Sequence, residues 1–208
     1  MKNSIPVLIL TLFFNIYLSA QPSGMLTLQV PGRNQYASIN EKGISVLPSG
    51  RFVSPAGEMI RITHDPFGMA VSPDGRKAVT LHNGVFTIID LLSLNNIRVP
   101  SYDNTLKSPL SNGSFLGVTF AADNRTIFLS GGDNGAVIKY DIEKMMTLDS
   151  ISLNGKIGDT YFDDSFTSDL LLNESRNELL VLDRGNFRLV RIDLDTKTIT
   201  ATIPVGRQ

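Results

Sequence analysis

A pattern of about 50 residues occurs three times in this sequence, at residues 66–91, 114–142 and 165–194. Each copy contains an apolar run, a polar turn, a second apolar run, a glycine-containing turn and a third run that closes on an aspartate. The closing residues, Asp90, Asp141 and Asp193, are 51 and 52 residues apart. A fixed period of this size indicates a stacked or radial repeat protein. The recurrence of the aspartates predicts a structural role in turn hydrogen bonds.

Each repeat divides into four short runs rich in Val, Ile, Phe and Thr, the residues favoured in β-strands. The runs of the first repeat cover residues 67–72, 77–82, 85–91 and 97–100. The first turn contains Asp74 and Gly75, which both tolerate the positive φ that a tight hairpin turn requires. The sequence therefore predicts four antiparallel strands in each repeat, joined as a meander, without a sustained helical period.

Four-stranded sheets repeated at this interval are typical of a β-propeller, in which each sheet is one blade. The predicted fold class is all-β, with about four blades present in an incomplete ring. The first of these blades is more divergent and precedes the three clear repeats. The predicted blades cover approximately residues 26–62, 66–100, 114–153 and 165–205. A compact ring of four blades is the structural alternative, because blade number varies in this architecture.

The first 20 residues have the composition of a secretory signal peptide. Lys2 provides a positive charge, residues 5–18 form a short apolar segment, and Ser19 and Ala20 precede the predicted cleavage point. The mature chain then covers residues 21–208 and has no membrane span, since the apolar run is too short; an uncleaved N-terminal anchor is the alternative. Together with the absence of cysteine, this predicts a secreted or periplasmic bacterial protein without disulfides.

Composition and missing motifs exclude several function classes. The net charge of −1, without a cluster of Lys and Arg, argues against a nucleic-acid partner. The sequence contains no Cys-x-x-Cys-His for a covalent haem and no Gly-x-Ser-x-Gly around a serine nucleophile. Because no paired base and nucleophile is recognisable, the sequence predicts no cofactor and leaves open whether the protein is an enzyme.

The first repeat carries a family resemblance. The segments PFGMAVSPDGRKAVT (66–80) and VFTIIDL (85–91) resemble the repeat of bacterial seven-bladed propellers of the YVTN type, across residues 26–208. The later repeats depart from that pattern at 122–124 and 174–176, where other residues replace Pro-Asp-Gly. Residues 33–62 further resemble the start of secreted Bacteroidetes-like proteins that join such a propeller to an alkaline-phosphatase-like phosphoesterase domain. That resemblance implies that the catalytic residues would lie in a second domain, of which this sequence contains none.

One set of loops is the predicted binding site. In a meander blade, the loop between strands two and three and the connection to the next blade lie on the same side, and loops on a rigid scaffold are where binding residues collect. The predicted ligand-binding residues in these loops are His64, Asp65, His82, Asn83, Asp133, Asp159, Asp163, Asp164, Asp183 and Arg184. The alternative for each is a solvated turn residue. Asp159, Asp163 and Asp164 could supply oxygen ligands to Ca²⁺. Their spacing matches no EF-hand loop, and no metal site is predicted.

These observations predict a secreted propeller module that binds an unknown small ligand or partner domain, and that belongs to a longer protein. The alternatives are the N-terminal propeller of a phosphoesterase and a lactonase-like propeller that acts through its central channel. A lactonase would need polar residues on the first strand of each repeat. Only Asp169 is ionisable among residues 67–71, 116–120 and 167–171, which makes the lactonase the weaker alternative.

Overall fold

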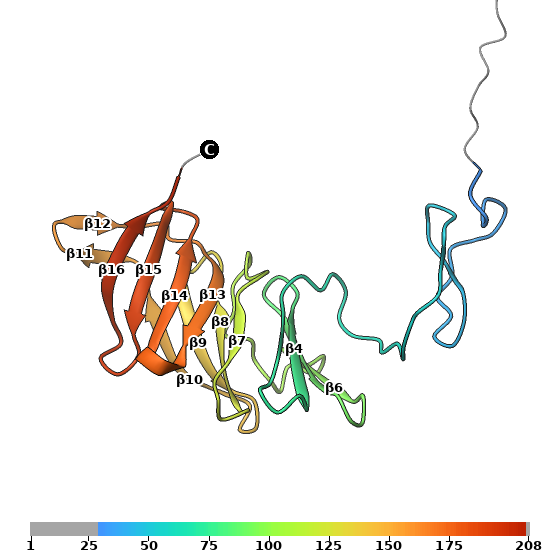
Figure 1. Cartoon of the computed structure of the whole chain (residues 1–208), viewed down its shortest axis with the longest axis horizontal. Helices are drawn as coiled ribbons and strands as arrows, with labels where there is room; N and C mark the ends of the chain where they lie inside the picture. The colour runs from blue at the N-terminus through green and yellow to red at the C-terminus, as the bar shows by residue number, and fades with distance from the viewer. Residues whose placement is uncertain (1–28, 207–208) are drawn as a thin grey trace, which may run out of the picture. The chain divides into compact units, whose positions relative to one another are not determined.

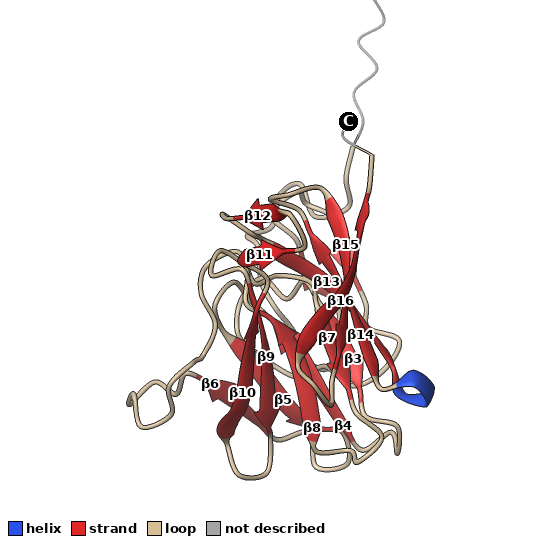
Figure 2. Cartoon of the chain, turned by 90° about the vertical axis from the view of Figure 1, so that its left-hand side faces the viewer, coloured by secondary structure: helices blue, strands red, loops and turns tan. Residues whose placement is uncertain are grey.

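The structure, a computed structural model, describes residues 29–206. The predicted signal peptide lies outside the described residues. The described part is built from β-strands, with a single turn of 3-10 helix, η1 (Glu174–Arg176) (Figure 2). It divides between residues 59 and 60 into two compact units.

The N-terminal unit contains less sheet than the sequence predicts. Its strands β1 (Ser45–Val46) and β2 (Phe52–Val53) pair with each other, and Ser38 forms an isolated bridge to Val46. Four strands were expected over residues 26–62, yet residues 58–62 form none. Over residues 36–40 only Ser38 pairs, beside a local turn in which the Ser45 hydroxyl accepts the Asn40 amide hydrogen at 2.9 Å.

The second unit contains three four-stranded antiparallel sheets, here called blades A, B and C. Blade A consists of β3 (Met69–Val71), β4 (Lys77–Leu81), β5 (Phe86–Asp90) and β6 (Asn96–Val99). Blade B consists of β7 (Val118–Phe120), β8 (Thr126–Ser130), β9 (Ala136–Asp141) and β10 (Met146–Ser152). Blade C consists of β13 (Thr167–Asn173), β14 (Glu178–Asp183), β15 (Arg188–Asp193) and β16 (Thr198–Pro204). Strand order follows the chain in each sheet, so the predicted meander and the all-β class are confirmed (Figure 1).

A two-stranded hairpin between blades B and C was not predicted. Its strands, β11 (Gly155–Ile157) and β12 (Thr160–Phe162), pair only with each other. The sequence analysis assigned residues 159–164 to a loop, because two three-residue strands give too short a pattern to recognise. The hairpin therefore places Asp159 in a tight turn rather than in an open loop.

The recurring aspartates have the predicted structural role. In each blade, one carboxylate oxygen accepts the backbone amides two and three residues further on: Asp90 from Leu92 and Ser93, Asp141 from Glu143 and Lys144, and Asp193 from Asp195 and Thr196, at 2.7–3.1 Å. These bonds close the turn between strands three and four. The same residue recurs because the same backbone turn recurs.

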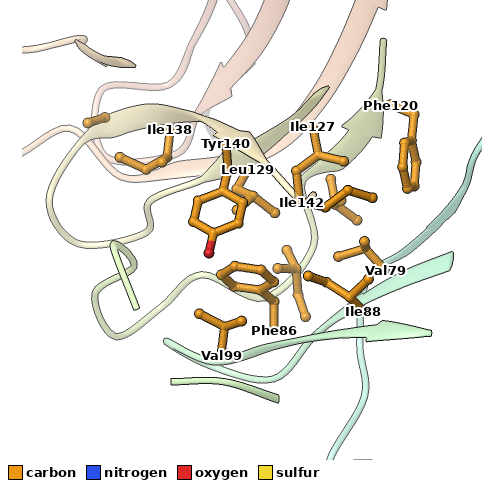
Figure 3. Close-up of a cluster of buried hydrophobic side chains, with 13 residues drawn as sticks. Val79, Phe86, Ile88, Val99, Phe120, Ile127, Leu129, Ile138, Tyr140 and Ile142 are labelled. Carbon is orange, nitrogen blue, oxygen red and sulfur yellow. The ribbon is translucent and has the colours of Figure 1, made fainter. Parts of the chain in front are cut away.

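The hydrophobic core lies between successive blades. One cluster joins blade A to blade B, with Phe86 and Tyr140 in an edge-to-face contact at 5.1 Å between ring centroids (Figure 3). The other joins Phe128 and Val137 of blade B to Val181 and Val190 of blade C. Blade B is thus buried on both faces, which explains why its strands show little polar alternation.

The turns between strands one and two also connect neighbouring blades. The Asp74 amide donates to the Asn124 side chain at 2.8 Å, and the Ala122 amide donates to the Glu174 carboxylate at 2.5 Å. The paired residues are 50 and 52 positions apart, close to the repeat period. Each repeat therefore bonds to the next through equivalent turns.

Candidate functional site

The loop face consists of the segments 63–65, 82–84, 106–114, 131–135, 159–164 and 183–186. Hydrogen bonds connect several neighbouring pairs of these segments. The Asn83 side chain accepts the Gly113 amide at 2.7 Å, the Asp133 amide donates to the Asn112 carbonyl at 2.9 Å, and the Asn186 side chain donates to the Asp163 carbonyl at 2.9 Å. The structure therefore brings neighbouring predicted loops together. In these pairs, a loop between strands two and three hydrogen-bonds to a segment that connects two blades.

His82 lies inside the blade rather than on the loop face. Its side chain is buried, with Nδ1 2.8 Å from the His64 carbonyl and Nε2 2.7 and 3.1 Å from the hydroxyls of Thr80 and Thr87. Because a carbonyl only accepts, Nδ1 carries the proton and Nε2 is an acceptor. Burial lowers the pKa of His82 below its usual value of 6.5, which favours this neutral form. His82 thus anchors the 63–65 segment and does not face solvent.

His64 and Asp65 form the accessible part of that segment. Their side chains are 81% and 74% exposed, and His64 Nδ1 lies 3.0 Å from an Asp65 carboxylate oxygen. An exposed pair of this kind contributes little to stability. It presents an imidazole and a carboxylate to a partner. The hydrogen bond from His82 to the His64 carbonyl fixes the backbone below them.

Asp183 is also an internal residue. It is fully buried and forms an ion pair with Arg188 at 2.8 Å, while it accepts the Phe166 amide at 3.0 Å. Burial alone would raise the pKa of Asp183, but the hydrogen bonds, led by that of Arg188, outweigh it and hold the pKa below its usual value. Asp183 therefore stays ionised as a support of the loop face.

Arg188 is the residue that the sequence analysis missed. Its guanidinium donates to the Leu153 carbonyl at 2.6 Å and lies 3.6 Å from the centre of the Phe162 ring. It thereby joins the β11–β12 hairpin to blade C. The available signal was an arginine directly before the apolar residues Leu189 and Val190, a position where an unpaired charge would be costly.

Arg184 is exposed beside a cavity of about 440 Å³. Its guanidinium carbon is 5.3 Å from the centre of the Phe166 ring, and its amide donates to the Phe166 carbonyl at 2.8 Å. Leu182 and Val205 also line the cavity. A cation stacked at the edge of an apolar hollow suits a partner with both apolar and acidic groups.

The remaining predicted residues are polar groups at the surface. Asn83 has φ of 59° and uses its side chain to hold the next segment, whereas Asp133, Asp159, Asp163 and Asp164 are exposed. Within residues 29–206, no group of three or more His, Asp or Glu side chains is placed to hold a metal ion. The exposed acids are therefore spread along the loop face and do not converge on one point.

Comparison with known proteins gives the fold. Sequence comparison finds no match among protein-family models or curated proteins. Two similar solved structures are titled "Structure of U3-55K" (TM-score 0.54, 11% identity) and "Crystal structure of RRP9 WD40 repeats" (TM-score 0.53, 12% identity). The chain has a β-propeller fold.

Each of these two comparisons covers 71% of this chain, but only 42% and 41% of the respective solved chains. This chain thus spans less than half the length of the propellers it resembles, which agrees with an incomplete ring. At such low identity the likeness concerns the fold alone. Among the described residues, no helix has the length and apolar character to cross a membrane.

Proposed function

We propose that this chain is a propeller-type binding scaffold that recognises a partner domain or ligand through its loop face. The observation that carries the proposal is that hydrogen bonds hold neighbouring segments of the loop face together. His82 and Asp183, both buried, hold the backbone of segments whose exposed members are His64, Asp65 and Arg184. Exposed polar groups fixed in advance lose little conformational entropy on binding.

The structure favours binding over catalysis at this face. His82, the histidine best placed to be oriented by neighbours, is buried and bonded on both ring nitrogens. The exposed His64 contacts Asp65 but no Ser or Thr hydroxyl that could act as a nucleophile. Asp169 of the first strand of blade C is exposed and accepts the neighbouring Leu170 amide. A single carboxylate of this kind gives no support to a lactonase.

We further propose that the protein is a bacterial one, secreted or periplasmic, and part of a longer polypeptide. The signal-like residues 1–20 and the absence of cysteine support export. The resemblance of residues 33–62 supports the alternative in which the propeller precedes a phosphoesterase domain of the YVTN-associated kind. Determining the mature N-terminus tests the first point, with Gln21 expected. Sequencing beyond codon 208 tests the second, and a frame without a phosphatase domain would remove that alternative.

A pair of matched arginine variants tests the scaffold itself. The exported chain is crosslinked in extracts of its native source, and captured proteins are quantified by mass spectrometry. Arg184→Ala on the loop face is expected to reduce capture of the partner at least tenfold. Arg76→Ala, at another exposed arginine in the turn between β3 and β4, should leave it unchanged. Equal capture by both variants, or a loss confined to Arg76→Ala, would refute recognition through the loop face.

A further inference from the structure

A groove lies between blades B and C on the side opposite to the loop face, among the turns that join strands one to two and strands three to four. Its volume is about 420 Å³, within the range of small-molecule sites. Phe128 of blade B and Leu172 and Leu194 of blade C form the apolar part of its lining. Both walls of this groove, here called groove BC, belong to described blades.

An equivalent groove lies between blades A and B. Its volume is about 330 Å³, and its lining includes Lys77, Ile88 and Glu143. The Lys77 ammonium forms an ion pair with the Glu143 carboxylate at 3.2 Å, from blade A to blade B. The lysine of this groove, here called groove AB, therefore has its counter-charge inside the chain.

The repeat shows which residues differ between the two grooves. Thr126 pairs with the closing aspartate of blade B as Lys77 does with that of blade A. The Thr126 hydroxyl donates to the Asp123 carboxylate at 2.6 Å, within blade B. No ion pair therefore joins two residues that line groove BC in the described chain. From groove AB to groove BC, the equivalent residues are Lys77 and Thr126, Ile88 and Lys139, and Glu143 and Asp195.

Lys139 brings a half-buried positive charge into groove BC. Its ammonium lies 5.7 Å from the centre of the Phe128 ring. Asp149 stands opposite Lys139 on the neighbouring strand, but its carboxylate is held by Lys197 at 2.6 Å. Within residues 29–206, no carboxylate oxygen lies within 4 Å of the Lys139 ammonium. Because lysine is seldom buried without a paired charge, an anionic group in the groove would complete this environment.

Exposed carboxylates line the same groove, on Asp123, Glu174 and Asp195. The first accepts hydrogen bonds within its own turn, and the Glu174 carboxylate accepts the Ala122 amide. The Asp195 carboxylate forms no hydrogen bond or ion pair with another described residue. Groove BC thus offers a free carboxylate and a lysine without a counter-ion beside an apolar surface.

We propose that groove BC binds a free α-amino acid with an apolar side chain. The ligand carboxylate pairs with Lys139, and the ligand amino group pairs with Asp195. Its side chain packs against Phe128, Leu172 and Leu194. A ligand with both charges leaves neither ion of the groove without a partner, which a purely cationic or anionic ligand does not achieve. The site lies away from the loop face, so it does not depend on the proposed partner recognition.

Calorimetric titration of the purified chain tests the ligand class. L-leucine is the probe, and isopentylamine and isocaproic acid have its apolar body without the carboxylate or without the amino group. We expect leucine to bind with a dissociation constant of about 1 mM or lower, and each analogue to bind at least tenfold more weakly. No measurable binding of leucine, or an analogue that binds as tightly as leucine, would overturn the proposal.

Matched variants locate the site. Lys139→Ile introduces the residue that blade A has at this position, Ile88, which is 7% exposed. It should weaken leucine binding at least tenfold and leave isopentylamine unaffected. Lys156→Ile, at an exposed lysine of the loop face, is the control and should bind leucine as the unmodified chain does. Circular dichroism establishes that the variants are folded.

Asp195→Asn provides a second variant for the same site. It should weaken the binding of leucine but not of isocaproic acid, because it removes only the partner of the amino group. Arg184→Ala, which tests partner recognition at the loop face, should bind leucine normally. Unchanged leucine binding in both Lys139→Ile and Asp195→Asn would refute the assignment to groove BC, as would an equal loss in Lys156→Ile.

Discussion

The Asp183→Asn variant tests how the loop face of blade C is supported. Asp183 is buried, and its carboxylate receives hydrogen bonds from Arg188 at 2.8 Å and from the Phe166 amide at 3.0 Å. Asparagine keeps the volume and one acceptor oxygen but removes the charge. The Arg188 guanidinium then stays buried without a counter-charge, although it keeps its bond to the Leu153 carbonyl.

The expected cost follows from that unpaired charge. Removing one partner of a buried ion pair costs about 3–5 kcal/mol, because the remaining ion is desolvated without compensation. Since asparagine retains some hydrogen bonding, we expect about 3 kcal/mol, or a fall in Tm of about 6–12 °C for a chain of this size. The double variant Asp183→Leu/Arg188→Met removes both charges and should be more stable than Asp183→Asn alone.

Urea unfolding at neutral pH measures these free energies. Asp195→Asn, at an exposed position of blade C, controls for the loss of one charge and should change the free energy of unfolding little. The reasoning fails if Asp183→Asn costs no more than Asp195→Asn. It also fails if the free energy of unfolding that the double variant loses equals the sum of the losses in Asp183→Leu and in Arg188→Met.

The same pair predicts a pH dependence. The pKa of Asp183 lies below its usual value of 3.8 in the folded chain. A group with a lowered folded pKa adds stability above its unfolded pKa, and this is lost as the pH falls through the folded pKa. The stability difference between the unmodified chain and Asp183→Asn should therefore be full at neutral pH and shrink below pH 3.8.

Three further variants test single features. The buried Tyr140 hydroxyl, whose pKa burial raises to about 12, has no hydrogen-bond partner among the described residues; Tyr140→Phe should leave stability unchanged or raise it by about 1 kcal/mol in urea unfolding. A Cβ on Gly117 would lie 2.4 Å from the Ser168 carbonyl oxygen, so Gly117→Ala should cost about 1–3 kcal/mol, whereas Gly57→Ala meets nothing within 4 Å and should melt unchanged. Because burial lowers the pKa of His82, the unfolded chain binds a proton at this residue before the folded chain does as the pH falls below 6.5. Tm should therefore decrease toward acid pH in the unmodified chain, and less so in His82→Gln. Equal slopes of Tm against pH in the two proteins would contradict the assigned burial.

Local sequence patterns were sufficient for much of the second unit. The Asp74-Gly75 turn and the short apolar runs around it placed the strands of blade A, because turn chemistry and strand preference act over a few residues. The aspartates at the end of the third strands were assigned to turns for the same reason, and the structure confirms their backbone bonds. The N-terminal unit differed: its described strands are two residues long, and side chains at residues 40–45 hydrogen-bond to the backbone in a local turn.

The candidate site shows where sequence reasoning stops. His64 and His82 looked equivalent as loop histidines, yet one is 81% exposed and the other is buried by a segment 18 residues away in the chain. Asp183 and its neighbour Arg184 likewise both looked like loop residues, but Asp183 is the buried counter-ion of Arg188. Exposure depends on which segments meet in space, and no local pattern records this.

The sequence by itself determined the repeat, its four-strand unit, the turn residues and the side on which the loops gather, because each rests on local geometry repeated at a fixed period. The tertiary structure alone decided which loop residues are exposed, that a hairpin is joined to blade C through Phe162 and Arg188, and that Ile203 stays open while Val99 and Ile151 are covered. The three residues occupy the same place in the repeat, because each pairs with the residue four positions before the closing aspartate of the third strand. Their burial differs because it depends on whether another sheet packs against the residue, and not on the residue's place in the repeat.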